Sequence, residues 1–122
     1  MKQFAIWKVG EEEYKLKLAT STIGELEDKL RRGLMDVIAG ANTIPPLSIM
    51  LTITHGAMKK WNAGIRRSDV DDIFDMYIKE GGSQLEFFTK VFMEIYKVSG
   101  FFTKAATEEM DAQQEKVQEL LE

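Results

Sequence analysis

Apolar and polar side chains alternate with a period of two at the beginning of the chain. The alternation runs from Phe4 to Val9, stops at a glycine and three glutamates at 10–13, and resumes from Tyr14 to Leu18. This pattern around a glycine-containing turn predicts a β-hairpin. A two-stranded ribbon is only marginally stable in water, so we expect the hairpin to lie on helices or to pair with another chain.

The rest of the chain follows the helical period. Apolar residues recur at spacings of three and four, which predicts amphipathic helices over 22–38, 46–61, 68–80, 83–98 and 103–122. Gly33 interrupts the first of these, where it either permits a close contact or marks a break, since glycine in a helix costs about 1 kcal/mol relative to alanine. We therefore predict a mainly α fold: a compact bundle of about four to five helices with an N-terminal β-hairpin and a C-terminal polar helix.

Capping residues mark the expected ends of these helices. A hydroxyl side chain followed three residues later by an acid can satisfy the free amides at a helix start, as in a capping box. Three pairs have this spacing: Thr22 and Glu25, Ser68 and Asp71, and Ser83 and Glu86. Gly81-Gly82 predicts the end of one helix, and Pro45-Pro46 predicts the beginning of another. We expect residues 40–43 to form a loop between helices.

Composition and charge narrow the class of protein. The 122 residues, 44% hydrophobic and 30% charged, suit one soluble globular domain, and the absence of cysteine excludes a disulfide framework and a thiolate metal site. No apolar run approaches the roughly 20 residues of a membrane span, and the N-terminus lacks the apolar segment of a secretory signal. We expect no membrane partner, and the net charge of −4 disfavours a nucleic-acid surface.

The negative charge is concentrated at the C-terminal end. From Thr103 onward there are six acidic side chains and two lysines, which accounts for the whole net charge of −4 and leaves the preceding part neutral. We therefore divide the chain into a helical domain with its hairpin, 1–102, and an acidic helical tail, 103–122.

Two groups of residues suggest chemistry. Asp71-Asp72 with Asp75 has the spacing by which isoprenoid enzymes hold magnesium diphosphate, since such carboxylates share a helix face. Those enzymes are larger and enclose an apolar cavity, so a solvated acidic face at a helix start is the simpler interpretation. His55 is the single histidine and has no companion motif. We predict no enzymatic activity, no cofactor and no metal site.

The two helices joined by Gly81-Gly82 have the order of a DNA-binding helix-turn-helix. A recognition helix offers polar and basic side chains at its start. The second helix instead begins with the apolar and acidic sequence Ser83–Phe88, so we expect no nucleic-acid partner.

Aromatic residues gather towards the end of the 1–102 segment. Phe88 and Phe92 lie on one helical stripe with Leu85, Val91 and Ile95, and Phe87 and Tyr96 widen this stripe. The stripe favours core packing for Phe88, Phe92 and Tyr96. Phe101-Phe102 follow a helix-ending glycine and either pack back on the helix or anchor a partner. A helix that is apolar most of the way round is either central in the core or carries a partner site, so the candidate partner-binding residues are Phe87, Tyr96, Phe101 and Phe102.

The order of these elements resembles the tail assembly chaperones of long-tailed bacteriophages and of prophages in Gram-positive bacteria. The resemblance covers most of residues 1–102 and lies in the residues that mark where helices begin and end. Its segments are Tyr14–Leu18, Thr22–Glu27, Ile44–Leu47, Ser68–Ile73, Tyr77–Gly82 and Ser99–Phe102.

The resemblance implies a viral protein without enzymatic activity that acts in the host cytoplasm. Chaperones of this kind bind the tape measure protein and keep it soluble while tail tube protein polymerises around it, so both are expected partners. A wide apolar helix face at 85–98 and seven methionines suit tolerant packing against a helical client. A homo-oligomer through the hairpin edge stays open. The alternatives are a generic helical interaction or regulatory domain that uses its acidic tail, and a metal-dependent enzyme that uses the aspartates.

Overall fold

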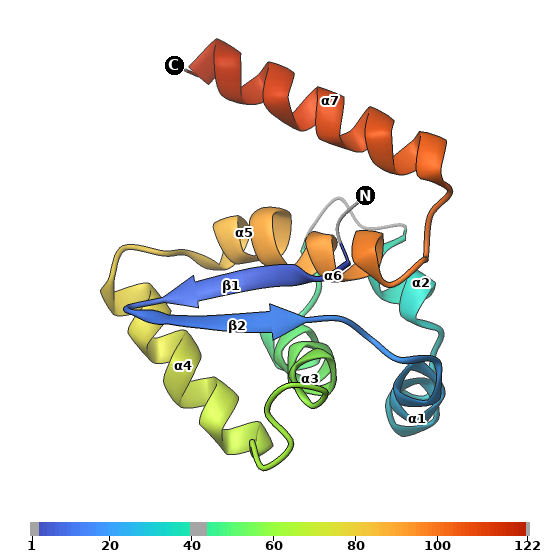
Figure 1. The fold of residues 1–122 in the computed structure, drawn as a ribbon, viewed down its shortest axis with the longest axis vertical. Helices are drawn as coiled ribbons and strands as arrows, with labels where there is room; N and C mark the ends of the chain where they lie inside the picture. The colour runs from blue at the N-terminus through green and yellow to red at the C-terminus, as the bar shows by residue number, and fades with distance from the viewer. Residues whose placement is uncertain (1–2, 40–43, 122) are drawn as a thin grey trace.

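A computed structural model of the chain describes residues 3–39 and 44–121, without the side chains of residues 117, 118 and 121. The elements follow in the order β1 (Ala5–Val9), β2 (Glu12–Leu16), α1 (Thr20–Leu30), α2 (Leu34–Ile38), α3 (Leu47–Met58), α4 (Arg67–Lys79), α5 (Gln84–Phe87), the π-helical segment η1 (Phe88–Phe92), α6 (Met93–Val98) and α7 (Lys104–Leu121) (Figure 1). The predicted fold class, mainly α with an N-terminal hairpin and a polar C-terminal helix, is confirmed. The predicted loop at 40–43 lies outside the described residues.

The hairpin is antiparallel and has a shorter turn than predicted. Val9 lies opposite Glu12, so the turn is Gly10-Glu11 alone, and Glu12 and Glu13 belong to β2. Gly10 has a left-handed φ of 63°, which glycine adopts without a steric penalty. The amide of Gly10 donates a hydrogen bond of 2.7 Å to the Glu80 carboxylate, which fastens the turn to the end of α4.

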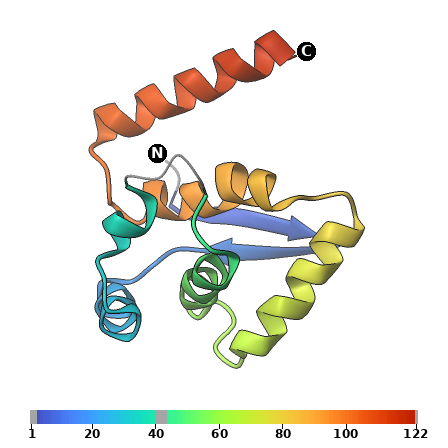
Figure 2. The same cartoon turned by 180° about the vertical axis from the view of Figure 1, so that it is seen from behind.

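One face of the hairpin is covered by helices. Ala5, Trp7 and Val9 are buried, whereas Ile6 and Lys8 between them are exposed. The helices lie on the buried side (Figures 1 and 2), with α3 against β2, and α4, η1 and α6 against β1. The prediction that the hairpin lies on helices is therefore confirmed, and the opposite face meets solvent.

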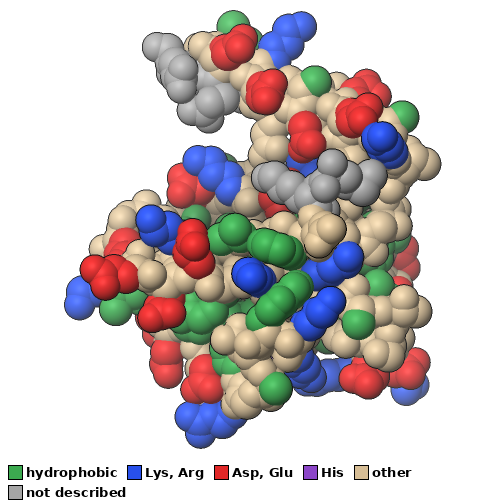
Figure 3. All heavy atoms as spheres, viewed as in Figure 1, with side chains coloured by type: hydrophobic (Ala, Val, Ile, Leu, Met, Phe, Trp, Pro, Cys, Tyr) green, Lys and Arg blue, Asp and Glu red, His purple; other side chains and the backbone are tan. Residues whose placement is uncertain are grey.

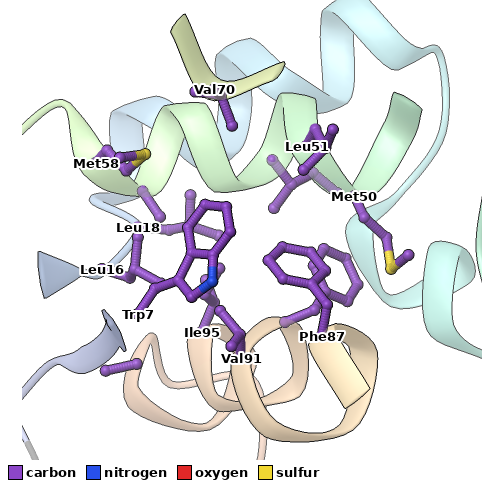
Figure 4. Packing of buried hydrophobic residues seen from close by; sticks show 14 of the residues in the cluster. Trp7, Leu16, Leu18, Met50, Leu51, Met58, Val70, Phe87, Val91 and Ile95 are labelled. Atoms are coloured by element: carbon purple, nitrogen blue, oxygen red, sulfur yellow. The ribbon is translucent and has the colours of Figure 1, made fainter. Parts of the chain in front are cut away.

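The core is built around Trp7, which is 1% exposed. Its indole packs edge-to-face on the rings of Phe87, at 5.0 Å between centroids, and Tyr77, at 5.8 Å. Side chains of α3 and of the α5–α6 segment close around it from opposite sides (Figure 4). The hairpin thus joins the helices into one hydrophobic core, whose burial supplies the main driving force for folding.

The predicted helix over 22–38 is two helices. α1 ends at Leu30, Arg31 takes a left-handed φ of 59°, and Gly33 precedes α2 as its N-cap. Gly33 therefore marks a break. The carboxylate of Glu27 accepts a 2.9 Å hydrogen bond from the Leu34 amide and so caps the start of α2.

Two of the three predicted capping boxes are wrong. α1 begins at Thr20, before Thr22, and α4 begins at Arg67, before Ser68, with Arg66 as its N-cap. Asp69 accepts the Arg66 amide at 2.8 Å, which starts α4 two residues earlier than a Ser68–Asp71 pair would. At the Ser83–Glu86 pair, the Ser83 hydroxyl does accept the Glu86 amide, at 3.0 Å.

The helix boundaries that we predicted from the glycines and prolines agree with the structure. α4 ends at Lys79, and Gly81 follows with a φ of 102°, which a side chain would make unfavourable. Pro46 is the N-cap of α3, as expected from Pro45-Pro46, but α3 ends at Met58 and does not reach Trp61.

The segments α5, η1 and α6 follow one another without a gap, and we call residues 84–98 the rod. A π-helical segment has i→i+5 hydrogen bonds and therefore shifts the residues after it around the helix. The predicted stripe is wrong at its start, because Leu85 is 63% exposed, and Phe87 takes the core position instead.

Candidate functional site

α7 follows the helical domain at 1–102, which we call the body, and runs beside the rod as a separate helix (Figures 1 and 2). Between α7 and the rod lies an open groove of about 760 Å³. Its lining comes from both sides, with Lys90, Glu94, Lys97 and Val98 on the rod and with Lys104, Thr107, Glu108, Asp111, Gln114 and Glu115 on α7. The volume lies within the range of roughly 300–1,000 Å³ typical of ligand sites.

Lys97 lies at the base of this groove and connects its two walls. Its side chain is only 6% exposed, and its Nζ lies 2.8 Å from a carboxylate oxygen of Glu94 and 2.9 Å from Asp111 on α7. Nζ also donates to the Gln114 amide oxygen at 3.2 Å, and Gln114 donates to the backbone carbonyl of Thr89 at 3.2 Å. These polar contacts fasten α7 to the rod.

The Lys97 ammonium is held in its charged form. Burial alone would lower the pKa of Lys97, but hydrogen bonds to Asp111 and Glu94 more than offset burial, so the pKa is raised. A buried charge without partners is unfavourable. Asp111 on α7 therefore supplies one of the two carboxylates that stabilise the buried ammonium of Lys97.

Beyond Gln114, the described side chains of α7 are exposed. Ala106, Thr107 and Met110 in its first half are half-buried, whereas Leu120 is 82% exposed. The space-filling view shows an opening between the far end of α7 and the body (Figure 3). α7 is therefore an arm whose described contacts with the rod lie between Ala106 and Gln114.

Two of the predicted partner-binding residues lie in the core. Phe87 and Tyr96 are fully buried, and the Tyr96 hydroxyl donates a 2.7 Å hydrogen bond to the backbone carbonyl of Leu34. In this structure neither side chain reaches the surface. A partner-binding role for them stays a prediction, but their observed contacts are those of core residues.

Phe101 and Phe102 are half-buried and pack against the core. The ring centroids of Phe101 and Tyr96 are 4.6 Å apart, and the Phe101 amide donates a 3.3 Å hydrogen bond to the Tyr96 carbonyl. Of the two alternatives for this pair, the structure shows packing back on the helix end for Phe101. Anchoring of a partner by either phenylalanine stays a prediction.

The residues considered for chemistry are not brought together. Asp71, Asp72 and Asp75 are exposed on α4, and Asp71 forms an ion pair of 2.6 Å with Arg67. His55 lies 2.9 Å from the Ile65 carbonyl. Within residues 3–39 and 44–121, no group of three or more acidic or histidine side chains is placed to hold a metal ion.

Sequence reasoning missed the cluster of Lys97, Glu94, Asp111 and Gln114. Its signal was weak: Glu94 and Lys97 are the only charged residues in the otherwise apolar segment 91–98. Their partners on α7 are fixed by how the chain turns after Val98, which the local pattern does not reveal.

Comparisons with known proteins identify a family but no characterised relative. The sequence profile of a family of unknown function, DUF6096, matches residues 2–120, from the hairpin through most of α7. No curated protein and no solved structure matches the chain. In the described part of the chain, none of the helices combines the length and apolar character that crossing a membrane requires.

Proposed function

The chain belongs to the DUF6096 family of unknown function, and for it we propose a chaperone function without enzymatic activity. It binds the tape measure protein of a phage or prophage tail in the host cytoplasm and keeps it soluble while the tail tube is assembled. The tail tube protein is a second partner in this proposal.

The observation that carries the proposal is the open groove between α7 and the rod. A long helical client exposes apolar stripes that aggregate unless they are covered, and a groove between helices covers such a stripe by helix-in-groove packing. The groove is open to solvent and is lined by residues of two helical segments, the rod and α7. The resemblance in helix punctuation over residues 1–102 supports the same function.

Co-expression tests this proposal. The tape measure protein encoded at the same locus is expressed with this chain, with an empty vector, and with an unrelated acidic helical protein of similar size. We expect the tape measure protein to become soluble and to co-purify only with this chain. If it aggregates equally in all three, although the chain itself is folded, the proposal fails.

A second candidate is a generic helical interaction or regulatory domain that docks through its acidic arm. The specific observation in its favour is that α7 is acidic, largely exposed and included in the family match. Genes of this family in neighbourhoods without tail genes would favour this second function, whereas consistent tail-gene neighbours favour the chaperone.

A further inference from the structure

We infer that the groove between α7 and the rod binds one amphipathic helix of a partner protein, with basic side chains along the edge that faces α7. This inference rests on the proposed function, because it names the part of the molecule that would hold a client helix and the chemistry of that helix.

The α7 wall of the groove is acidic on balance, since three carboxylates and one lysine, Lys104, line it. Glu108, Asp111 and Glu115 lie at spacings of three and four, so their carboxylates share the face of α7 that lines the groove. Asp111 is engaged with Lys97. In the described part of the chain, Glu108 and Glu115 form no ion pair and are exposed, so both carboxylates are available to basic side chains of an occupant.

The apolar surface that the rod offers to the groove is small. Among the described residues Val98, which is half-buried, is the single apolar lining residue, and the stems of Lys90 and Lys97 add methylene groups. Lysine side chains cover apolar surface with their methylene stems while their charged ends stay at the edge or find a partner. Lys97 is already neutralised by Glu94 and Asp111, so the floor presents no free positive charge at that point.

The length of the α7 wall matches a short helix. Lys104 and Glu115, the first and last lining residues of α7, are separated by roughly 16 Å at the helical rise of about 1.5 Å per residue. An occupant of about three turns would therefore lie along the groove, with its apolar stripe on Val98 and its basic edge against Glu108 and Glu115.

Charge decides between a basic partner helix and α7 of a second copy. Between Lys104 and Leu121, α7 carries five acidic side chains and two lysines, a net charge of −3. Two such helices repel each other, whereas a basic helix is attracted to the same wall. We therefore assign the groove to a helix of opposite charge.

The test uses the full chain and two synthetic peptides of the length of α7. Both peptides carry the same leucine stripe, flanked by lysines in one and by glutamates in the other, and binding is measured by fluorescence anisotropy. We expect the lysine peptide to bind at least about tenfold more tightly than the glutamate peptide, and salt to weaken its binding.

Charge-reversing variants locate the site. The double variant Glu108→Lys/Glu115→Lys should weaken binding of the lysine peptide by about tenfold, since two attractive contacts become repulsive. The matched control Glu109→Lys/Glu119→Lys changes the charge of α7 equally at exposed residues that do not line the groove, and should bind nearly as the wild type does. Circular dichroism confirms that all variants are folded.

Three results with the peptides would overturn the inference: no binding of the lysine peptide, equal losses in both double variants, or wild-type dimers that exclude the peptide and so assign the groove to a second copy. Co-expression of the same variants with the tape measure protein separates this inference from the proposed function. If wild type and groove variant solubilise it equally well, the chaperone function holds and the groove inference fails. If the peptide binds through Glu108 and Glu115 but the tape measure protein still aggregates, the groove inference holds alone.

Discussion

At the scale of the residue, Lys97 connects the acidic arm to the neutral body. The net charge of the whole chain equals that of residues 103–122, so the body has no charge excess of its own to attract α7. The attraction comes instead from one buried ammonium that faces Glu94 on its own helix and Asp111 on α7. A local ion pair therefore positions an element of 18 residues.

Replacing this lysine should release the arm. Lys97→Met keeps a long apolar stem but removes the charge that holds Asp111. We expect hydrogen exchange to become faster in residues 104–116 and to stay slow in α3. Because Asp111 is about half exposed, the loss in unfolding free energy should be only about 1–2 kcal/mol.

The control for the arm is Lys90→Met, which removes an exposed ion pair with Glu86 of 3.7 Å. It should leave hydrogen exchange in α7 unchanged. Equal effects of the two variants on α7 would contradict a specific role of Lys97.

The same contact predicts a pH dependence of the arm. The pKa of Lys97 is raised in the folded protein: burial works against the charge, but the hydrogen bonds to Asp111 and Glu94 outweigh it. The stabilisation is then complete below the unfolded-chain pKa of about 10.4 and is lost as pH rises through the folded value. Hydrogen exchange in α7, compared with α3 at each pH, should show selective release as the pH rises through the alkaline range.

Tyr96 is the second residue with a measurable individual role. Burial raises the pKa of its hydroxyl, which stays protonated and donates to the Leu34 carbonyl. Tyr96→Phe leaves that carbonyl without its partner and should lower the unfolding free energy by about 1–3 kcal/mol in urea titrations. Tyr14→Phe, at a half-buried ring, should change it by less than about 0.5 kcal/mol. Equal losses of unfolding free energy in the two variants would show that the hydrogen bond of Tyr96 does not stabilise the fold.

At the scale of the element, the joint between α4 and α5 depends on a close approach of backbone and ring. A Cβ atom at Gly82 would overlap the ring of Tyr77, which is packed between Trp7 and Phe87. Glycine is therefore required here for space, whereas neighbouring Gly81 is required for its φ. Glycine is therefore required at positions 81 and 82, after the end of α4, for two different physical reasons.

Gly82→Ala should consequently destabilise the fold. The Tyr77 ring has to move out of the aromatic cluster, which should cost about 1–3 kcal/mol, as overpacked sites usually do. The matched control is Gly64→Ala, where a Cβ meets no atom within 4 Å, and where alanine should be neutral or slightly stabilising. Thermal unfolding of the two variants measures the difference, and a stable Gly82→Ala variant would show that the ring relocates freely.

At the scale of the whole molecule, the hairpin, α1–α4 and the rod share one core, and α7 lies outside it (Figure 1). The charge pattern predicts a boundary at 102/103, which stays a prediction, and α7 begins at Lys104. The family match nevertheless continues to residue 120, so the arm belongs to what the family shares.

Removing the arm tests this division. A chain that ends at Phe102 should still unfold cooperatively, with a loss of about 1–2 kcal/mol, because none of the described side chains of α7 is fully buried and Lys97 keeps Glu94 as a partner. Near-ultraviolet circular dichroism, which reports on buried Trp7, follows the transition. A truncated chain without a cooperative transition would show that α7 is part of the folding unit.

The sequence by itself determined the features that depend on local periodicity: the hairpin, the helical segments, the helix end at Gly81 and the acidic arm. Alternation and glycine conformation act within a few residues, so they are visible without a structure. Only the tertiary structure decided the break after Leu30, the burial of Phe87 in place of Leu85, and the contact of Lys97 with Asp111. These depend on which surfaces meet when distant segments pack together, and the energy of that packing outweighs local preference.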